Sequence, residues 1–194
     1  FQTAIDGFGT ASGFLLNSGE TVSTVIRGLT IKNCVPTSKT GSAIFVEDNS
    51  GISVRKCIFK NNGLGASSSF ASVIKLGDNQ TSGPQSAIDS CIFYQNTSAL
   101  IHSTKKSWYA RYCLFQENSY NGQLVGNGHD AGNDQDISNC VFRDNYSANS
   151  TIVGLGHAKF LSECFFINNI CDNSGIVYLG TVWSGTNVID HCTF

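Results

Sequence analysis

The chain has 194 residues, a formal net charge of −2 and only 13% charged residues, compared with roughly 25% in an average globular domain. A charge so close to zero excludes a strong electrostatic attraction to nucleic acid or to an anionic membrane. No apolar run approaches the ~18 residues that span a bilayer, so we expect no membrane insertion. Apolar residues recur throughout the chain, which excludes a disordered composition.

The predicted elements begin with an apolar burst at 14–16 and a degenerate repeat unit at 29–34. The unit then occurs five times in full with the pattern Cys-x-Phe-x-x-Asn, and a cut-off copy ends the chain at 192–194. The copies recur about every 27 residues, a period typical of stacked repeat architectures. The predicted structural ladder consists of Cys57, Cys91, Cys113, Cys140, Cys164, Cys192, Phe59, Phe93, Phe115, Phe142, Phe166, Asn62, Asn96, Asn118, Asn145 and Asn169.

Each copy predicts a strand that follows a corner. Cys and Phe are two residues apart, which keeps both side chains on one face of a strand. An apolar residue also lies three positions before each Cys, a spacing that requires the chain to bend. Polar pairs such as Arg55-Lys56 and Asp89-Ser90 occupy the bend and favour an outward corner. A second apolar burst follows each Asn at a variable distance, so the length variation belongs to the turns.

Short strands and corners repeated in register predict an all-β fold, a right-handed single-stranded parallel β-helix of about seven coils. We interpret residues 1–194 as a single β-helix domain. Because the chain lacks an initiator Met and stops inside a repeat, we expect it to be a fragment of a longer repeat protein. A two-layer β-sandwich is the alternative, and it predicts antiparallel hairpins with a turn about every 8–12 residues.

The Asn and Cys columns each have a structural interpretation. Asn tolerates the left-handed backbone region, and stacked Asn amides can also hydrogen-bond along a column. A buried Cys behaves as a small hydrophobe, which is the interpretation we favour for the Cys column. Disulfides between neighbouring coils are the alternative, since strands about 4.8 Å apart lie within the range that a disulfide tolerates. Cys34 and Cys171 lie outside the column.

The repeated Phe-x-x-Asn tetrapeptide resembles the repeats of the chlamydial polymorphic outer-membrane proteins. That family pairs the tetrapeptide with Gly-Gly-Ala followed by an aliphatic residue, and Gly41-Ser42-Ala43-Ile44 is the nearest match in this chain. The resemblance extends from about residue 26 to the end. It implies a surface-exposed passenger β-helix that is often adhesive.

Two sets of residues are weak candidates for catalysis. Glu117 and Asp144 stand two residues after Phe in adjacent repeats, so they could form an acid/base pair. His129 and His157 stand in equivalent turns, where they could act as acid/base groups or bind a metal. The interpretations we favour are a solvated outer face for the two carboxylates and ordinary turn composition for the two histidines, and we assign no catalytic residue and no metal or cofactor.

Aromatic residues and sequons complete the candidates. Trp108, Tyr109 and Trp183 could stack on sugar rings or pack against a corner, whereas we interpret Lys105-Lys106 as a solvated basic pair. Sequons occur at Asn79, Asn96, Asn145 and Asn149. About this number is expected by chance in a chain so rich in Asn, Ser and Thr. The sequons therefore leave glycosylation open.

The sequence favours a non-enzymatic, secreted or cell-surface β-helix that acts as a structural, adhesive or filament-forming module. Possible partners are a carbohydrate, a host-surface protein, or the chain itself or further coils at the uncapped end at 192–194. The alternative is a β-helix that binds or degrades polysaccharide as a lyase or hydrolase. That alternative requires carboxylates or histidines gathered on one outer face.

Overall fold

The computed structural model describes residues 3–36, 41–47, 49–63, 72–77, 85–103, 106–127, 134–156, 159–179 and 188–194. Within these ranges all regular secondary structure is β-strand, arranged in three seven-stranded sheets and one three-stranded sheet. The pairings between neighbouring strands are parallel and join equivalent positions of successive repeats. The predicted parallel β-helix is therefore confirmed, and the β-sandwich alternative is wrong.

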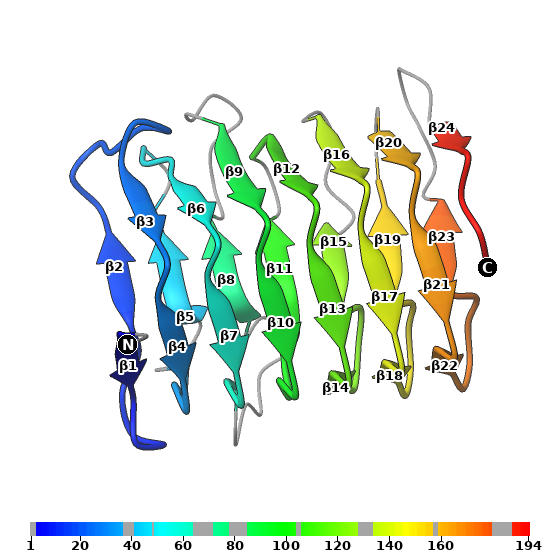
Figure 1. Cartoon of the computed structure of the whole chain (residues 1–194), viewed down its shortest axis with the longest axis horizontal. Helices are drawn as coiled ribbons and strands as arrows, with labels where there is room; N and C mark the ends of the chain where they lie inside the picture. Colours follow the sequence, from blue (N-terminus) through cyan, green and yellow to red (C-terminus); the bar gives the residue numbers. More distant parts are fainter. Residues whose placement is uncertain are drawn as a thin grey trace.

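The three long sheets run the length of the molecule, and we name them A, B and C (Figure 1). Sheet A contains β1 (Ala4–Asp6), β4 (Thr30–Lys32), β7 (Ile58–Lys60), β10 (Ile92–Tyr94), β13 (Leu114–Gln116), β17 (Val141–Arg143) and β21 (Phe165–Ile167). Sheet B contains β2 (Phe14–Leu16), β5 (Gly41–Val46), β8 (Ser72–Leu76), β11 (Ala99–Ser103), β15 (Val125–Asn127), β19 (Val153–Leu155) and β23 (Val177–Leu179). Sheet C contains β3 (Val25–Arg27), β6 (Ser53–Arg55), β9 (Ser86–Asp89), β12 (Trp108–Arg111), β16 (Gln135–Ser138), β20 (Lys159–Ser162) and β24 (Val188–Asp190). A short sheet D contains β14 (Ser119–Tyr120), β18 (Tyr146–Ser147) and β22 (Ile170–Cys171).

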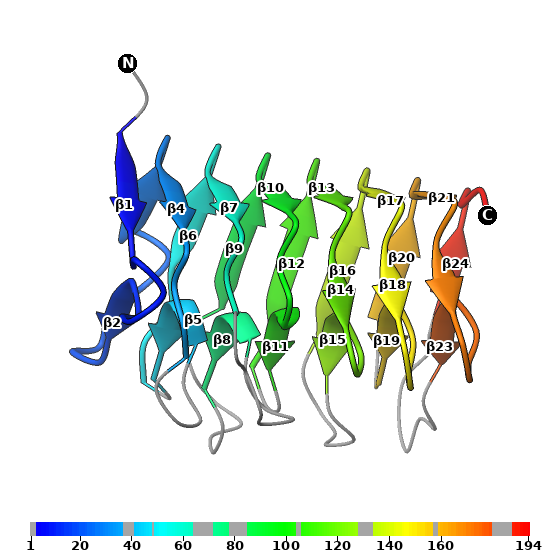
Figure 2. The same cartoon turned by 90° about the horizontal axis from the view of Figure 1, so that it is seen from below.

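Each coil passes from sheet C into sheet A and then to sheet B, with sheet D between A and B in the later coils (Figures 1 and 2). In Figure 1 the strands of sheet A descend in front and those of sheet B ascend behind as the chain advances, which makes the helix right-handed. The first and last turns are incomplete, so the described chain forms slightly fewer complete coils than the seven expected. No helix in the described ranges is long and apolar enough to cross a membrane.

Left-handed residues form the corners on both sides of sheet A. The residue before each repeat Cys has a positive φ, for example 51° at Lys56 and 54° at Tyr112, which confirms the predicted corner. A second left-handed residue precedes each ladder Asn, for example Glu117 with φ 53° and Asp144 with φ 54°. The expectation that the ladder Asn itself adopts this conformation is therefore wrong. The turn is made one residue earlier, and the Asn side chain is directed inward.

The Phe and Cys columns fill the core behind sheet A. Successive rings from Phe59 to Phe194 stack with centroids 4.6–4.9 Å apart, a separation that follows from the strand spacing. All eight cysteines are free thiols, and the five between Cys57 and Cys164 in the column are buried. The buried-hydrophobe interpretation of the column therefore holds. Phe194 ends the stack and is 65% exposed, and the expected cover of this end by further coils or another chain stays a prediction.

Candidate functional site

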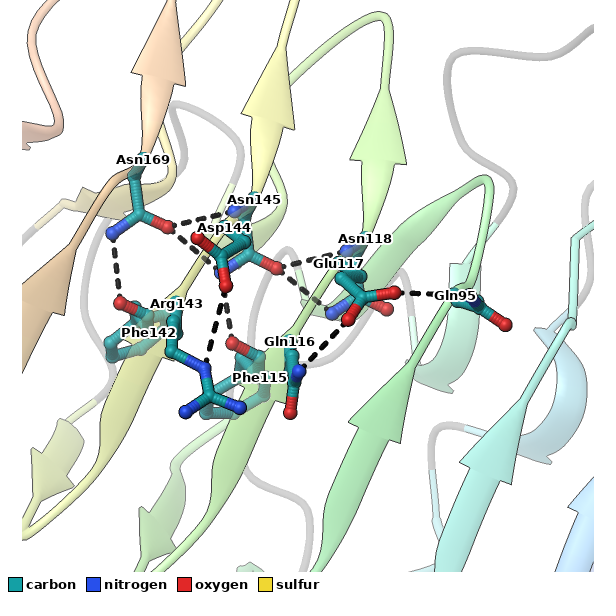
Figure 3. A network of polar contacts seen from close by, with 10 residues as sticks. All are labelled: Gln95, Phe115, Gln116, Glu117, Asn118, Phe142, Arg143, Asp144, Asn145 and Asn169. Atoms are coloured by element: carbon teal, nitrogen blue, oxygen red, sulfur yellow. Dashed lines mark hydrogen bonds and ion pairs between the residues drawn. The ribbon is translucent and has the colours of Figure 1, made fainter.

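A ladder of asparagine side chains supports the corner between sheets A and B, which contains the predicted carboxylates (Figure 3). The amide nitrogen of Asn96 donates to the side-chain oxygen of Asn118 at 2.9 Å, and that of Asn118 donates to Asn145 at 3.0 Å. Each side-chain oxygen also accepts the backbone N–H of the equivalent residue one coil earlier, which is Cys34 for Asn62 and an Asn for the others, as between Asn96 and Asn118 at 3.0 Å. The predicted amide ladder is therefore confirmed.

The amide nitrogens of Asn96, Asn118 and Asn145 have a second acceptor, the carbonyl of the Phe one coil earlier; for Asn62 it is the Ile31 carbonyl. Asn118 donates to Phe93 at 2.9 Å, and Asn145 donates to Phe115 at 2.9 Å. Every polar atom of a buried interior ladder amide is thus paired, which is the condition for burying it without penalty. Two of the four sequons begin at ladder residues, Asn96 and Asn145, whose side chains are buried and engaged in this way.

Glu117 and Asp144 lie side by side on successive coils at this corner, as the sequence predicts (Figure 3). The amides of Gln95 and Gln116 donate to the Glu117 carboxylate at 3.0 and 2.9 Å. The Asp144 carboxylate forms a weak ion pair with Arg143 at 3.4 Å. Both carboxylates stand on an exposed corner, where water reaches them freely. Their contacts therefore suit surface hydration.

The aromatic candidates divide between core and surface. Trp108 is 0% exposed, so the prediction that it stacks on a sugar ring is wrong. The alternation of β12 explains its burial, because Trp108 is two residues before the inward-facing Ala110 and shares its face. Tyr109 points outward and is covered by the guanidinium of Arg111, 4.7 Å from the ring centre. Trp183 lies outside the described residues.

His129, His157 and the sequon at Asn79 also lie outside the described residues. Lys105 is likewise outside them, but Lys106 is buried and its ammonium donates to the carbonyls of Glu47 and Ser50. The solvated interpretation of Lys106 is therefore wrong. In the described ranges no group of three or more His, Cys, Asp or Glu side chains could hold a metal ion.

A cavity of about 370 Å³ opens near the N-terminal end, against the outer side of sheet B. Phe14, Leu15 and Phe45 form its apolar walls, and Glu47 is the single ionisable residue in the lining. A single carboxylate offers no acid/base pair. Of the candidate residues that the structure describes, Glu117, Asp144, Trp108 and Tyr109, none lines this cavity.

The outer face of sheet A carries a row of apolar residues that also belongs to the repeat pattern. In the five full copies the residue after the Cys is apolar and points away from the core, and these residues stand in register on five neighbouring strands. We call this row the outer apolar stripe; it consists of Ile58, Ile92, Leu114, Val141 and Phe165. Ile92 is 37% and Phe165 is 50% exposed. At the strand spacing of about 4.8 Å the stripe is roughly 20 Å long.

Polar and charged rows border the outer apolar stripe on both sides. The row two residues after the stripe reads Lys60, Tyr94, Gln116, Arg143 and Ile167. The corner row two residues before the stripe reads Lys56, Ser90, Tyr112, Asn139 and Glu163, and Tyr112 in it is 64% exposed. The charge in this corner row changes from positive to negative along the molecule. The flat face therefore combines contiguous apolar surface with an axial charge gradient.

Comparison with known proteins identifies no relative: no family model matches, and neither a curated protein nor a solved structure matches the chain. The resemblance to chlamydial polymorphic outer-membrane repeats therefore stays a prediction that rests on the tetrapeptides themselves.

Proposed function

We propose that this β-helix is a non-enzymatic structural and adhesive module of a secreted or cell-surface protein, and that the outer face of sheet A is its contact surface. The observation that carries the proposal is the difference between the inward and outward side chains of sheet A. The repeated side chains all point inward and are paired or stacked. The outward row is contiguous, apolar and partly exposed, as expected of an interaction surface.

The surroundings of the two carboxylates also support a non-enzymatic role. A general acid or base usually occupies a concave, water-poor site that tunes its proton affinity. Glu117 and Asp144 lie instead on an exposed corner, with neutral amides beside Glu117 and one guanidinium beside Asp144. The Phe-x-x-Asn resemblance adds the expectation of an adhesive passenger at a cell surface.

Adhesion by beads coated with the full chain tests the proposal. The beads are applied to immobilised polysaccharides, among them polygalacturonate, alginate and chitin, and to collagen and fibronectin. We expect retention on at least one surface, a strong loss of retention for Leu114→Lys, and unchanged retention for the double variant Glu117→Gln/Asp144→Asn. Retention that is insensitive to Leu114→Lys, or absent from every surface, would contradict the proposal.

Polysaccharide cleavage is the second candidate, favoured by one observation: Glu117 and Asp144 do occupy adjacent coils at one corner (Figure 3). If the chain acts on uronic-acid polymers, reducing-end or unsaturated-product assays will detect turnover. Loss of that turnover in both Glu117→Gln and Asp144→Asn, with folding intact, would establish the enzyme. Turnover that persists in both variants would exclude this pair of residues.

A further inference from the structure

The outer face of sheet A is close to self-complementary when the order of its coils is reversed. The strand β13 lies at the middle of the five strands that carry the outer apolar stripe, so its first residue, Leu114, is the central residue of the stripe. Consider a two-fold axis that runs parallel to β13 and lies between the outer faces of the two copies. It would place Leu114 against its own copy, Ile92 against Val141, and Ile58 against Phe165. Each stripe residue would then meet an apolar residue. Such an arrangement is isologous, with the same patch used by both copies.

Opposite charges also come together when the order of the coils is reversed. The first corner row has Lys56 at one end and Glu163 at the other, both exposed, so the axis through β13 brings Lys56 of each copy to Glu163 of the other. The symmetry creates this pair twice. Opposite charges brought together at the rim of an interface fix its register and suppress other alignments.

The row on the other side of the stripe adds one complementary pair under this axis, Arg143 with Tyr94, whereas Lys60 comes opposite the apolar Ile167. Arg143 comes to the ring of Tyr94 in the second copy, a pairing of guanidinium and aromatic ring that is favourable. The same kind of contact already exists within the chain, where the Lys60 ammonium is 5.3 Å from the Tyr94 ring centre. The left-handed residues that precede the ladder asparagines form a second corner row, which includes Gln95, Glu117 and Asp144. Under the same axis the Gln95 amide comes to the Asp144 carboxylate. Glu117 alone meets its own like charge.

We propose that the outer face of sheet A binds a second copy of this chain, face to face, with the coils of the two copies stacked in opposite order. This inference rests on the proposed function and adds a second copy of the chain to the partners of the same surface. The stripe with its neighbouring row covers about 20 Å by 10 Å, much less than the roughly 800 Å² per partner of a standard interface. The association is therefore weak, with a dissociation constant on the order of 0.1 mM.

Sedimentation equilibrium of the full chain over a wide concentration range tests the proposal. The unmodified chain is expected to dimerise without forming larger species, because an isologous interface closes on itself. Lys56→Glu places like charges at both symmetric contacts and is expected to weaken the dimer by at least about tenfold. Arg27→Glu is the matched control, because it makes the same charge change on the outer side of sheet C and leaves the dimer unchanged.

The charge exchange Lys56→Glu/Glu163→Lys gives the sharpest result. It restores both contacts in reversed polarity, so the dissociation constant returns to within about threefold of the starting value. Glu117→Gln removes the single repulsive contact and is expected to tighten the dimer by about two- to fivefold. A double variant that stays as weak as Lys56→Glu alone, or a chain that remains monomeric at millimolar concentration, would overturn the inference.

The results also separate this inference from the proposed function. A monomeric chain whose coated beads are still retained through Leu114 would end the inference and leave the adhesive function standing. A chain whose self-association and bead retention are both indifferent to Leu114→Lys would end both.

Discussion

The inner and outer faces of sheet A are made by alternate residues of the same strands, yet they differ in what changes from coil to coil. Inside, Phe stacks on Phe at every level from Phe59 onward. Outside, the row that begins at Ile58 changes side-chain shape at almost every level, and the corner beside it changes charge. The difference shows that in-register stacking constrains residue identity only where a side chain packs in the core against the equivalent side chain of the next coil.

The physical origin of this difference is the parallel register. Each inward side chain lies directly above its equivalent, so stacking of like rings and pairing of like amides are available at every level. An outward side chain has water as an alternative partner and can vary at little cost to folding. The invariant columns therefore specify the fold, and the variable rows are free to specify a partner.

The largest effect is expected inside, at the asparagine ladder. Asn118→Ala removes the acceptor of two N–H donors of Asn96 and the donor to the Phe93 carbonyl. Because each buried polar group left unpaired costs about 1–3 kcal/mol, we expect the free energy of unfolding to fall by about 3–5 kcal/mol. Urea unfolding followed by circular dichroism measures it. A loss below about 1 kcal/mol would show that water replaces the ladder contacts.

A smaller effect is expected at Lys106, whose ammonium is buried but lies outside the repeat columns. Lys106→Met keeps the apolar stem but deprives the Glu47 and Ser50 carbonyls of their donor, so the expected loss is about 1–3 kcal/mol in urea unfolding. The matched control Lys56→Met changes an exposed lysine and is expected to cost less than about 0.5 kcal/mol. Equal losses in the two variants would restore the solvated interpretation of Lys106.

The Cys column makes the stability depend on alkaline pH. A hydrogen bond to the Cys140 thiol, together with burial, raises the pKa of Cys113 well above its ordinary value. The folded chain therefore keeps this proton while the unfolded chain releases it above about pH 8.5. The stabilisation is complete below that pH and declines as the pH rises, by up to about 1.4 kcal/mol per unit for each such thiol.

Urea unfolding under reducing conditions between about pH 7 and pH 10 measures this slope. Cys113→Ala removes one of the shifted thiols and is expected to make the decline shallower. A free energy of unfolding that is constant or increases over the alkaline range would contradict the buried-thiol account of the column.

The smallest effect is expected at a second row of asparagines, on the surface. Asn149 donates to Asn121 and accepts from Asn173 at 3.1 Å, so these residues repeat the amide-to-amide contact of the interior ladder. All three are exposed, and water can replace each contact. Asn149→Ala is therefore expected to change the free energy of unfolding by less than about 0.5 kcal/mol. A loss close to that of Asn118→Ala would remove the distinction between the two ladders.

The repeat pattern predicts the fold, the corner before each Cys and the amide ladder, because these depend on residues that recur in register. The same pattern also implies two further features. In the five full copies the residue after the repeat Cys is apolar but must point outward, since Cys and Phe on either side of it point inward. The burial of Trp108 follows from the same alternation, two residues before Ala110.

Other features could not be predicted from the sequence, for physical reasons. The left-handed corner residues include Tyr112, Glu117 and Glu163, which are not the residue types that usually mark this conformation. The coil imposes it on whatever residue occupies the corner. The reach of Lys106 to the carbonyls of Glu47 and Ser50 depends on the stacking of turns of unequal length, which no local pattern encodes.

The central claim, that alternate residues of one strand serve folding and binding separately, is tested most directly by unfolding two neighbouring variants of β13. The measurement is the free energy of urea unfolding of Phe115→Ser and Leu114→Ser, each at a concentration where the chain is monomeric. We predict a loss above about 3 kcal/mol for Phe115→Ser, from the core cavity and the buried hydroxyl. We predict a loss below about 1 kcal/mol for Leu114→Ser, which stays in contact with solvent. Equal losses in the two variants would contradict the account.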